Sequence, residues 1–378
     1  MPSGSVKPRL AVLITDAFAT PGGVQSVNRN LARALSACPD MEAEYFSLLD
    51  PADEAADPRY FPHSRFRAFG GSRLRFAGAV ILAFLSRGYA GILIMHRNLF
   101  PLAIVWQAVS SRPYLVFIHG VEIWERQPVW HRMALLGARR VLANSRFTAD
   151  RASASNGLSR DRVQVIPLCL DELRITGGPE VAPSRDAAPV LLTVGRADRG
   201  EGYKGQETVI RAMPRILAEY PTVRYAMVGG GDDEARLRQL SQALHVEQSV
   251  DFLGALSDEE RNARLGAATI FVMPSRGEGF GVVYLEAMNY RLPCIAGDSD
   301  GGREPVRDGI NGFTVDAASP VAVADAVCRL LSDAPLRSSM GEAGRRLIET
   351  EYSFANFSRS ITGAIERVII ERVAAEAA

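Results

Sequence analysis

Short apolar runs alternate with segments of helical periodicity along most of the chain. Runs of four to six leucine-rich or β-branched residues indicate buried strands, and apolar residues spaced three and four apart indicate helices. Strands are expected at residues 10–15, 44–48, 91–95, 114–118, 140–143, 163–166, 190–194, 225–228, 250–252, 270–273, 293–296 and 312–315. In the first half, helices are expected between the strands, for example at 24–35 and 99–109; in the second half they are expected at 206–220, 233–244, 258–267, 281–289, 321–332 and 355–374. Such alternation is typical of parallel sheets with helices on both faces.

The alternation is interrupted once, at 176–189, where Gly and Pro are frequent and no apolar period is present. This composition indicates a linker. A chain of 378 residues is also long for a single core. The sequence therefore predicts an α/β protein with two Rossmann-like, doubly wound domains at 1–175 and 190–352. Ligands of such sheets bind beyond the carboxyl ends of the strands, so the expected site is a cleft between the domains.

The composition is that of a folded protein, with 47% apolar and 23% charged residues. Two longer apolar stretches, 79–95 and 99–118, are each broken by an arginine next to Gly or Pro. Neither gives the roughly 20 clean apolar residues of a membrane span. No secretory signal is evident. A cytoplasmic location is expected, with peripheral attachment to the inner face of the membrane as an option.

A net charge of zero conceals an uneven distribution. The stretch from residue 58 to 121 has no acidic residue, and arginines alternate there with aromatic residues. The arginines are Arg59, Arg65, Arg67, Arg73, Arg75, Arg87, Arg97 and Arg112, and the aromatic residues include Tyr60, Phe61, Phe66, Phe69 and Phe76. This pattern fits an anionic membrane surface, and it fits equally well a solvated arginine face. Nucleic acid is not an expected partner, because the charge balance is neutral and no nucleic-acid motif is present.

Candidate anion-binding residues follow two of the expected strands. Gly195 and Arg196 end the strand at 190–194, and Lys204 follows shortly after. The chain has only two lysines, so a lysine kept at this point suits a crowded phosphate site. Gly22 and Gly23 lie between the first strand and a helix, where main-chain amides can approach an anion.

Histidine and acidic residues give further candidates. His119 directly follows the strand at 114–118, which places it at the ligand edge of the sheet, and His96 is a weaker alternative. Asp298 and Asp300 form a D-x-D pattern that is interpreted as turn chemistry rather than as a metal site. No histidine cluster has the spacing of zinc ligands.

Two glutamates flank the expected start of the helix at 281–289. Glu278 lies in the turn before it, and Glu286 lies about a turn and a half inside it. The free amides of a helix start attract phosphate or sugar oxygens, and a carboxylate can accept two hydrogen bonds from a vicinal diol. The pair is thus better suited to holding a nucleotide sugar than to acid–base work.

Together, Gly22–Gly23, His119, Gly195–Arg196, Lys204 and the 278–286 segment resemble the retaining glycosyltransferases of the GT-B fold, in particular family four with its E-x7-E signature. The resemblance covers essentially the whole chain and is most specific over 190–316. It implies two Rossmann-like domains around a cleft, with a C-terminal helix at 353–378 that packs on the N-terminal domain. It also implies transfer of a hexose from a UDP- or GDP-linked donor to a hydroxyl of a lipid-linked or surface-glycan acceptor.

By this resemblance, Glu286 would hold the ribose, and Glu278 with the amides of Gly279, Phe280 and Gly281 would bind the donor sugar. Arg196 and Lys204 would neutralise the leaving diphosphate, Gly22 and Gly23 would approach it, and His119 would lie beside the sugar ring. No metal or other cofactor is expected, since the cations take its place. The long loop between Arg196 and Lys204 leaves open whether Arg196 or Arg199 makes the second phosphate contact. A nucleotide-sugar hydrolase or epimerase, and a non-catalytic binding module, remain alternatives.

Overall fold

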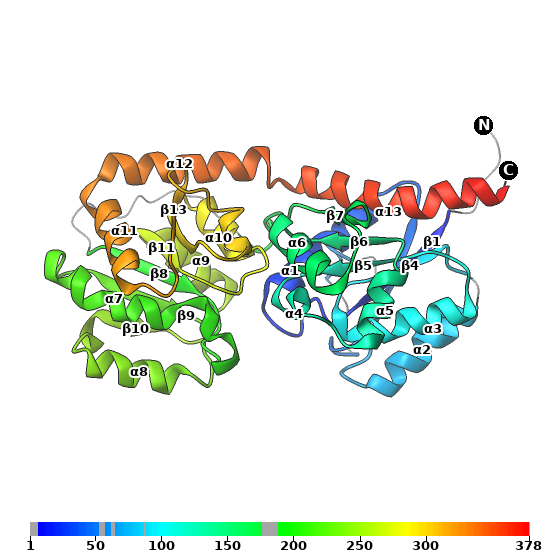
Figure 1. Cartoon of the computed structure of the whole chain (residues 1–378), viewed down its shortest axis with the longest axis horizontal. Helices are drawn as coiled ribbons and strands as arrows, with labels where there is room; N and C mark the ends of the chain where they lie inside the picture. Colours follow the sequence, from blue (N-terminus) through cyan, green and yellow to red (C-terminus); the bar gives the residue numbers. More distant parts are fainter. Residues whose placement is uncertain (1–6, 53–56, 62–64, 87, 176–187, 378) are drawn as a thin grey trace. The chain divides into compact units, whose positions relative to one another are not determined.

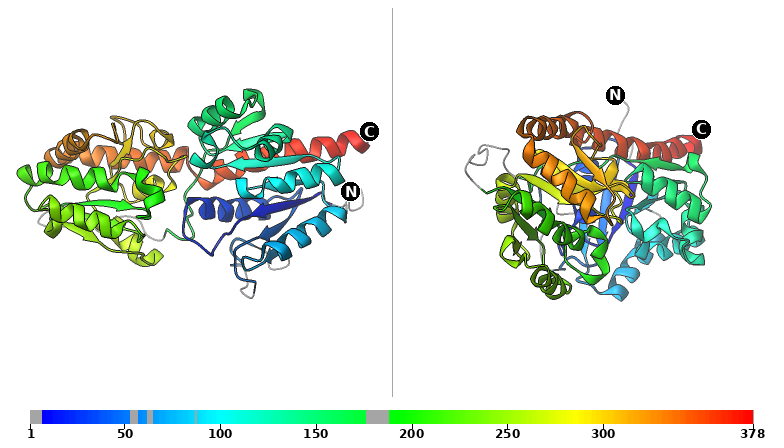
Figure 2. Two further views of the ribbon diagram at one scale, coloured as in Figure 1. Left: turned by 60° about the horizontal axis from the view of Figure 1, so that its bottom comes forward. Right: turned by 60° about the vertical axis from the view of Figure 1, so that its left-hand side comes forward.

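The computed structural model describes residues 7–52, 57–61, 65–86, 88–175 and 188–377. The chain divides into two compact units, one of residues 1–171 with 354–378 and one of residues 172–353. Most of the expected linker, 176–187, lies outside the described residues. Each unit contains one sheet with helices on both faces (Figures 1 and 2).

The sheet of the N-terminal unit has seven strands in the order β3-β2-β1-β4-β5-β6-β7, and all pairs are parallel. The strands are β1 (Arg9–Ile14), β2 (Glu42–Ser47), β3 (Phe66–Ala68), β4 (Gly91–Ile94), β5 (Tyr114–Ile118), β6 (Arg140–Ala143) and β7 (Val163–Val165). Six of them were expected within two residues at each end. The short edge strand β3 was missed, because a three-residue segment with a central arginine has no strand periodicity.

The helices of this unit are α1 (Gly23–Ser36), α2 (Arg73–Leu85), α3 (Pro101–Val109), α4 (Val121–Trp124), α5 (Val129–Gly137), α6 (Arg146–Asn156) and α13 (Phe354–Ala377). Helices α2, α3 and α5 pack side by side on one face of the sheet over a large apolar core (Figure 1). The long α13 packs against α1, and the guanidinium carbon of Arg33 lies 3.8 Å from the centre of the Phe354 ring. Buried Phe357, Ile361 and Ile365, spaced by four, form its packing face.

The C-terminal unit has a six-stranded parallel sheet in the order β10-β9-β8-β11-β12-β13. The strands are β8 (Val190–Val194), β9 (Arg224–Val228), β10 (Val250–Phe252), β11 (Ile270–Met273), β12 (Cys294–Gly297) and β13 (Gly312–Val315). The helices are α7 (Gln206–Glu219), α8 (Glu234–Ala243), α9 (Asp258–Ala267), α10 (Val282–Asn289), α11 (Pro320–Ser332) and α12 (Ala334–Thr350). Only α12 lacked a counterpart among the expected elements of this unit.

Strand order decides where each unit can bind a ligand. The order reverses between β1 and β4 in the first sheet and between β8 and β11 in the second. Crossover connections leave the sheet in opposite directions at such a point, which opens a crevice beyond the carboxyl ends of the two strands. The loops after β1, β4, β8 and β11 are therefore the positions to inspect for function.

Candidate functional site

The loop after β8 brings together two of the expected anion-binding cations. Gly195 and Arg196 follow the strand, and Lys204 lies at the end of a short 3-10 segment, Arg199–Lys204. A Cβ on Gly195 would lie 3.0 Å from Cδ of Lys204, so glycine leaves room for the lysine side chain to fold back over the strand end. The lysine is mostly buried, whereas Arg196 is exposed.

A glutamate that the sequence analysis did not single out links these cations. One carboxylate oxygen of Glu201 accepts a hydrogen bond from Arg196, and the other lies 3.3 Å from Nζ of Lys204. Lys204 Nζ also lies 3.6 Å from a carboxylate oxygen of Glu278. Arg196, Glu201, Lys204 and Glu278 thus form one cluster of alternating charge. Arg199, the alternative phosphate contact, makes no ion pair with this cluster within the described residues.

The turn after β11 carries Glu278 to the same place. Gly281 has a φ of 85° and precedes the first residue of α10, so Glu278 lies in the turn and Glu286 inside the helix, as the sequence predicts. A Cβ on Gly277 would lie 2.5 Å from the Tyr203 ring, which shows how closely the turn approaches the segment that ends at Lys204. The ring of Phe280 is buried against Tyr352.

Glu286 belongs to a separate group of charges. Its carboxylate lies 3.7 Å from Nε of Arg261 on α9, and Arg261 also pairs with Asp258. The two glutamates of the E-x7-E pattern therefore face different cations. The partner Arg261 could not be recognised from the sequence, because it comes from a helix that precedes Glu286 by more than twenty residues.

The two aspartates of the D-x-D pattern lie in different environments. Asp298 is exposed, whereas Asp300 is completely buried and accepts hydrogen bonds from main-chain amides. Across the described part of the chain, no group of three or more His, Cys, Asp or Glu side chains could hold a metal ion.

In the N-terminal unit, two buried aspartates shape the loop that leads to Gly22 and Gly23. Asp50, just beyond β2, accepts hydrogen bonds at 2.8 Å from the amides of residues 17, 18 and 19. Asp16 accepts from the amide and hydroxyl of Thr20 and from Gln25. These carboxylates hold the loop after β1 in one conformation. The sequence signal was available, because both aspartates follow the end of a strand just as His119 does.

His119 lies at the carboxyl end of β5, next to His96 at the end of β4. Its Nε2 lies 2.7 Å from the carbonyl oxygen of Met95, which assigns the proton to this nitrogen. Burial lowers the pKa of His119 to about 4, and burial lowers the pKa of His96 to about 4 as well. His119 is therefore neutral at pH 7.

The arginine–aromatic stretch at 59–112 is for the most part not a free surface. Arg59, Arg65 and Arg67 pair with Asp57, Glu42 and Glu44, and Arg97 and Arg112 donate to main-chain carbonyls. Most of its aromatic rings are buried, namely Tyr60, Phe61, Phe69 and Phe76. Arg73 and Arg75, both on α2, are exposed and form no ion pair with a described residue.

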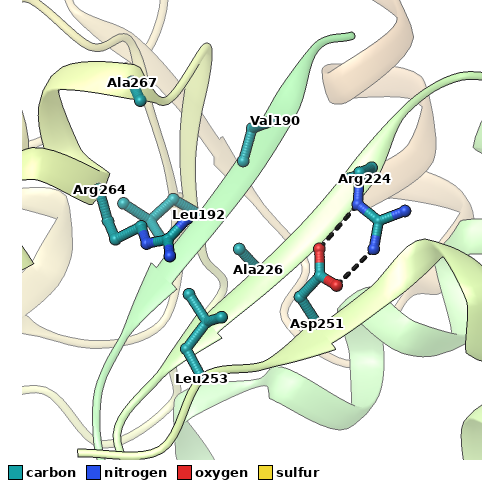
Figure 3. A pocket seen from close by; sticks show the side chains of 8 residues that line it. All are labelled: Val190, Leu192, Arg224, Ala226, Asp251, Leu253, Arg264 and Ala267. Carbon is teal, nitrogen blue, oxygen red and sulfur yellow. Dashed lines mark hydrogen bonds and ion pairs between the residues drawn. The ribbon is translucent and has the colours of Figure 1, made fainter. Parts of the chain in front are cut away.

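A cavity of about 370 Å³ in the C-terminal unit is lined by none of these residues (Figure 3). It is lined by Val190, Leu192, Arg224, Ala226, Asp251, Leu253, Arg264 and Ala267. Residues 190 and 192 alternate with Leu191, which belongs to the core beneath α7 and α11, so the cavity lies on the opposite sheet face. Its one acidic group, Asp251, is paired with Arg224, and its lining residues from β8 and β9 are the first and third residues of each strand.

No helix among the described residues combines the length and the apolar character that crossing a bilayer requires.

Comparison with known proteins identifies both halves. Residues 179–347 match the model for glycosyl transferases group 1, and residues 21–173 match the model for glycosyltransferase family 4. A GDP-mannose-dependent monoacylated alpha-(1-6)-phosphatidylinositol monomannoside mannosyltransferase of Corynebacterium glutamicum is 37% identical over 43% of this chain and 44% of its own length. A phosphatidyl-myo-inositol mannosyltransferase of Mycobacterium leprae is 28% identical over 95% of this chain and 97% of its own length.

Solved structures with the same fold include a sucrose-phosphate synthase of Thermosynechococcus elongatus, with a TM-score of 0.78 and 21% identity over 97% of this chain and all of that one. Anabaena HepE in complex with UDP-glucose has a TM-score of 0.77 and 19% identity over 95% of this chain and 99% of that one. At such identities these structures establish the two-domain GT-B fold and nothing further.

Proposed function

Because the chain belongs to the family 4-type glycosyltransferases of the GT-B fold, we propose that it transfers a hexose from a nucleotide sugar to a hydroxyl of a lipid-linked acceptor, with retention of configuration. Its relatives by sequence favour GDP-mannose as the donor and a phosphatidylinositol-based lipid as the acceptor. A UDP-linked donor and a surface-glycan acceptor are the alternatives within the same reaction class.

The observation that carries this proposal is the charge cluster after β8. Arg196 and Lys204 present two cations at the topological switch point, and the start of α10 lies beside them. A departing diphosphate needs this kind of compensation, because negative charge builds up on it as the bond to the sugar breaks. The same cations would supply in this site the charge that a metal ion supplies elsewhere.

The reaction follows from these roles. The bond between the anomeric carbon and the phosphate oxygen breaks, and a bond forms from that carbon to the acceptor oxygen. The acceptor hydroxyl gives its proton to the departing phosphate oxygen, so the charges balance without a protein base. Glu278 and the amides of Gly279, Phe280 and Gly281 would hold the sugar hydroxyls, and Glu286 would hold the ribose. Gly22, Gly23 and His119 are carried over from the resemblance as donor contacts that activity measurements have to test.

A hydrolase is less well supported by the arrangement. Glycoside hydrolysis uses two carboxyl groups on opposite sides of the scissile bond. Here Glu278 faces Lys204 and Glu286 faces Arg261, and both glutamates come from one turn-and-helix unit. This difference supports the proposal that the two glutamates bind two parts of one ligand.

The test is direct. Purified protein is titrated calorimetrically with GDP, UDP, GDP-mannose and UDP-glucose, and transfer of labelled sugar to phosphatidylinositol is measured with the donor that binds. Glu286→Ala is expected to weaken nucleotide binding about tenfold or more, and unchanged affinity would remove the ribose assignment. Release of free sugar without transfer to any acceptor would favour the hydrolase.

A lipid acceptor requires access to a membrane surface. The distribution of exposed apolar side chains supports one region of the protein for this contact. Of the twelve large apolar side chains that are exposed among the described residues, eight lie on α2, α3 and α5. We call these the α2–α5 patch: Leu74, Leu82, Leu85, Val109, Val129, Trp130, Met133 and Leu136. Leu74 is 88% exposed and Trp130 is 62% exposed. Side chains of this size are seldom left in water together on the surface of a monomer.

Charge favours a bilayer as the occupant of the α2–α5 patch. None of the three helices contains an acidic residue, and the arginines Arg73 and Arg75 lie within α2 itself. Apolar side chains and tryptophan enter the headgroup region while arginines meet anionic lipid headgroups. The proposal thus moves the expected membrane contact from the whole of 59–112 to α2, α3 and the later helix α5.

Co-sedimentation with vesicles of anionic phospholipid tests this surface. Leu82→Glu and Trp130→Glu are expected to reduce binding at least tenfold, whereas Val321→Glu, at an exposed apolar position on α11 outside the patch, serves as the control. Equal binding by all three variants would refute the assignment. Dimerisation that the two patch variants abolish, without vesicle binding by wild type, would show that a second copy covers the patch.

A further inference from the structure

We infer that Asp300 is a positioning residue for the donor-sugar end of the site, because its carboxylate holds the main chain of Glu278 so that the Glu278 side chain faces Lys204. This inference rests on the proposed role of Glu278. Asp300 is one of the two aspartates of the D-x-D pattern, which the sequence predicts to serve a turn rather than a metal ion.

The contacts of Asp300 are directed at the Glu278 turn. Asp300 follows β12, the strand beside β11, and its side chain is completely buried. One carboxylate oxygen accepts a hydrogen bond of 2.7 Å from the amide of Glu278, and the other accepts one of 2.9 Å from the amide of Gly302. The hydroxyl of Ser275, at the start of the same turn, also donates to this carboxylate.

Gly301, the next residue, binds the carbonyl group of Glu278. The amide of Gly301 donates a hydrogen bond of 2.8 Å to the carbonyl oxygen of Glu278. A Cβ on Gly301 would lie only 2.1 Å from the carbonyl oxygen of Gly279, so the two loops touch at a distance that only glycine permits. Both polar main-chain groups of Glu278 are thus bound by consecutive residues, 300 and 301.

This grip determines where the Glu278 side chain points. Once the amide and the carbonyl of a residue are held, its Cα–Cβ direction is set, and only the side-chain torsions remain free. The Glu278 carboxylate is then placed 3.6 Å from Nζ of Lys204. A reacting sugar held by Glu278 depends on this placement, since small displacements of a positioning group reduce rate strongly.

Burying a carboxylate to cap a turn costs desolvation free energy. Burial is the main cause that raises the pKa of Asp300 to about 7; the neighbouring Glu278 charge acts in the same direction, and the hydrogen bonds to the carboxylate oppose the rise. Asn or Ser could satisfy a simple turn without burying a charge. An unfavourable group kept directly beneath a ligand-binding residue is characteristic of functional sites. Asp298 supplies the contrast, because it lies two residues away, is exposed, and holds no part of the Glu278 turn.

Calorimetry on four full-length variants tests the inference: Asp300→Asn, Glu278→Ala, Gly301→Ala, and the matched control Asp298→Asn. Each is titrated with GDP and with GDP-mannose, and with the uridine pair if wild type prefers it. The informative quantity is the ratio of the two dissociation constants, because it isolates the contribution of the sugar. Asn keeps the volume of Asp300 but turns an NH₂ group toward one of the two amides, so one hydrogen bond is lost.

In Asp300→Asn the Kd for GDP is expected to stay within about twofold of wild type, while the sugar-to-nucleotide ratio rises about tenfold and kcat falls. Glu278→Ala is expected to raise the ratio similarly, and Asp298→Asn to leave it unchanged. If Asp300→Asn does not fold, Gly301→Ala disturbs the same contact from the other loop and is expected to raise the ratio. A purely structural role would weaken GDP and GDP-mannose binding equally, and that result would overturn the inference.

These measurements distinguish the positioning role of Asp300 from the sugar-binding role of Glu278 and from the proposed function. An unchanged ratio in Asp300→Asn and Gly301→Ala, together with a raised ratio in Glu278→Ala, refutes the positioning role alone. An unchanged ratio in Glu278→Ala removes the sugar-binding assignment, and the inference about Asp300 with it. Failure of wild type to bind any nucleotide sugar would refute the proposed function itself.

Discussion

Glu201 occupies the place between two cations where a diphosphate is proposed to bind, and this makes the effect of removing its charge calculable. The Glu201 carboxylate pairs with Arg196 and lies 3.3 Å from Nζ of Lys204. At that distance and an effective dielectric constant of about 20 to 80, the attraction between two unit charges is about 1 to 5 kcal/mol. An incoming diphosphate has to compete with this attraction.

Glu201→Gln removes the competing charge while keeping the shape of the side chain. We expect nucleoside diphosphates and inorganic pyrophosphate to bind about tenfold more tightly, which corresponds to about 1.4 kcal/mol of binding free energy. This value lies in the lower part of the calculated range of attraction because salt screens the charges. Release of the diphosphate product should slow accordingly, so kcat is expected to fall when product release limits turnover. The measurement is isothermal titration calorimetry with GDP, UDP and pyrophosphate at two salt concentrations.

The control for this prediction is Asp198→Asn. Asp198 is also an acid of the same loop, but its carboxylate lies 3.8 Å from Arg196 and contacts no other member of the cluster. A much smaller change is expected there. Weaker binding of diphosphate by Glu201→Gln would contradict the reasoning, because it would mean that Glu201 orients the two cations more than it competes for them.

The remaining predictions concern the cations, the metal requirement and pH. Lys204→Ala should lower turnover about 10²-fold, the scale seen when a charge-stabilising donor is lost, and wild-type turnover in a transfer assay would exclude its diphosphate role. Activity should persist in excess EDTA, and a strict dependence on added divalent metal would contradict the assignment of charge compensation to Arg196 and Lys204. Burial raises the pKa of Asp300 to about 7, so its contribution to stability is full below its ordinary value of 3.8 and is lost as pH rises through about 7. The unfolding free energy of wild type relative to Asp300→Asn should therefore fall between about pH 4 and pH 7, as measured by urea denaturation, and a constant difference would show that Asp300 does not titrate in this range.

The regular part of the fold was predictable because parallel strands buried on both faces leave a strong signal. Runs such as those of β5 and β11 are apolar throughout, so their limits matched the sequence expectation. The signal failed at the edge strand β3, which is half solvated and carries a central arginine. It also failed at α12, whose buried face includes two glycines that contact the main chain or side chains of other elements. Small residues in tight packing do not register as apolar periodicity.

Several candidate-site residues could be selected from the sequence by their position after a strand rather than by apolar periodicity. In a doubly wound sheet the loop positions that face ligands are set by topology, so Arg196, Glu278 and His119 could be chosen by their place after a strand. Their partners could not be chosen in this way. Glu201 contacts two cations of its own loop and Arg261 contacts Glu286 from another helix, and nothing in the local sequence of either residue distinguishes it from an ordinary surface charge.

The arginine-rich stretch shows why composition alone could not separate a membrane surface from an internal one. An arginine can place its guanidinium group over an aromatic ring and pair with a nearby carboxylate at the same time, as Arg67 does with Phe46 and Glu44. The arginines of such a stretch are therefore paired within the protein when a neighbouring strand supplies glutamates, as β2 does. Arg73 and Arg75, by contrast, lie on α2 next to the exposed Leu74 and form no ion pair with a described residue. It is this absence of partners in the described structure, and not the number of arginines, that directs the membrane hypothesis to α2 and to its neighbours α3 and α5.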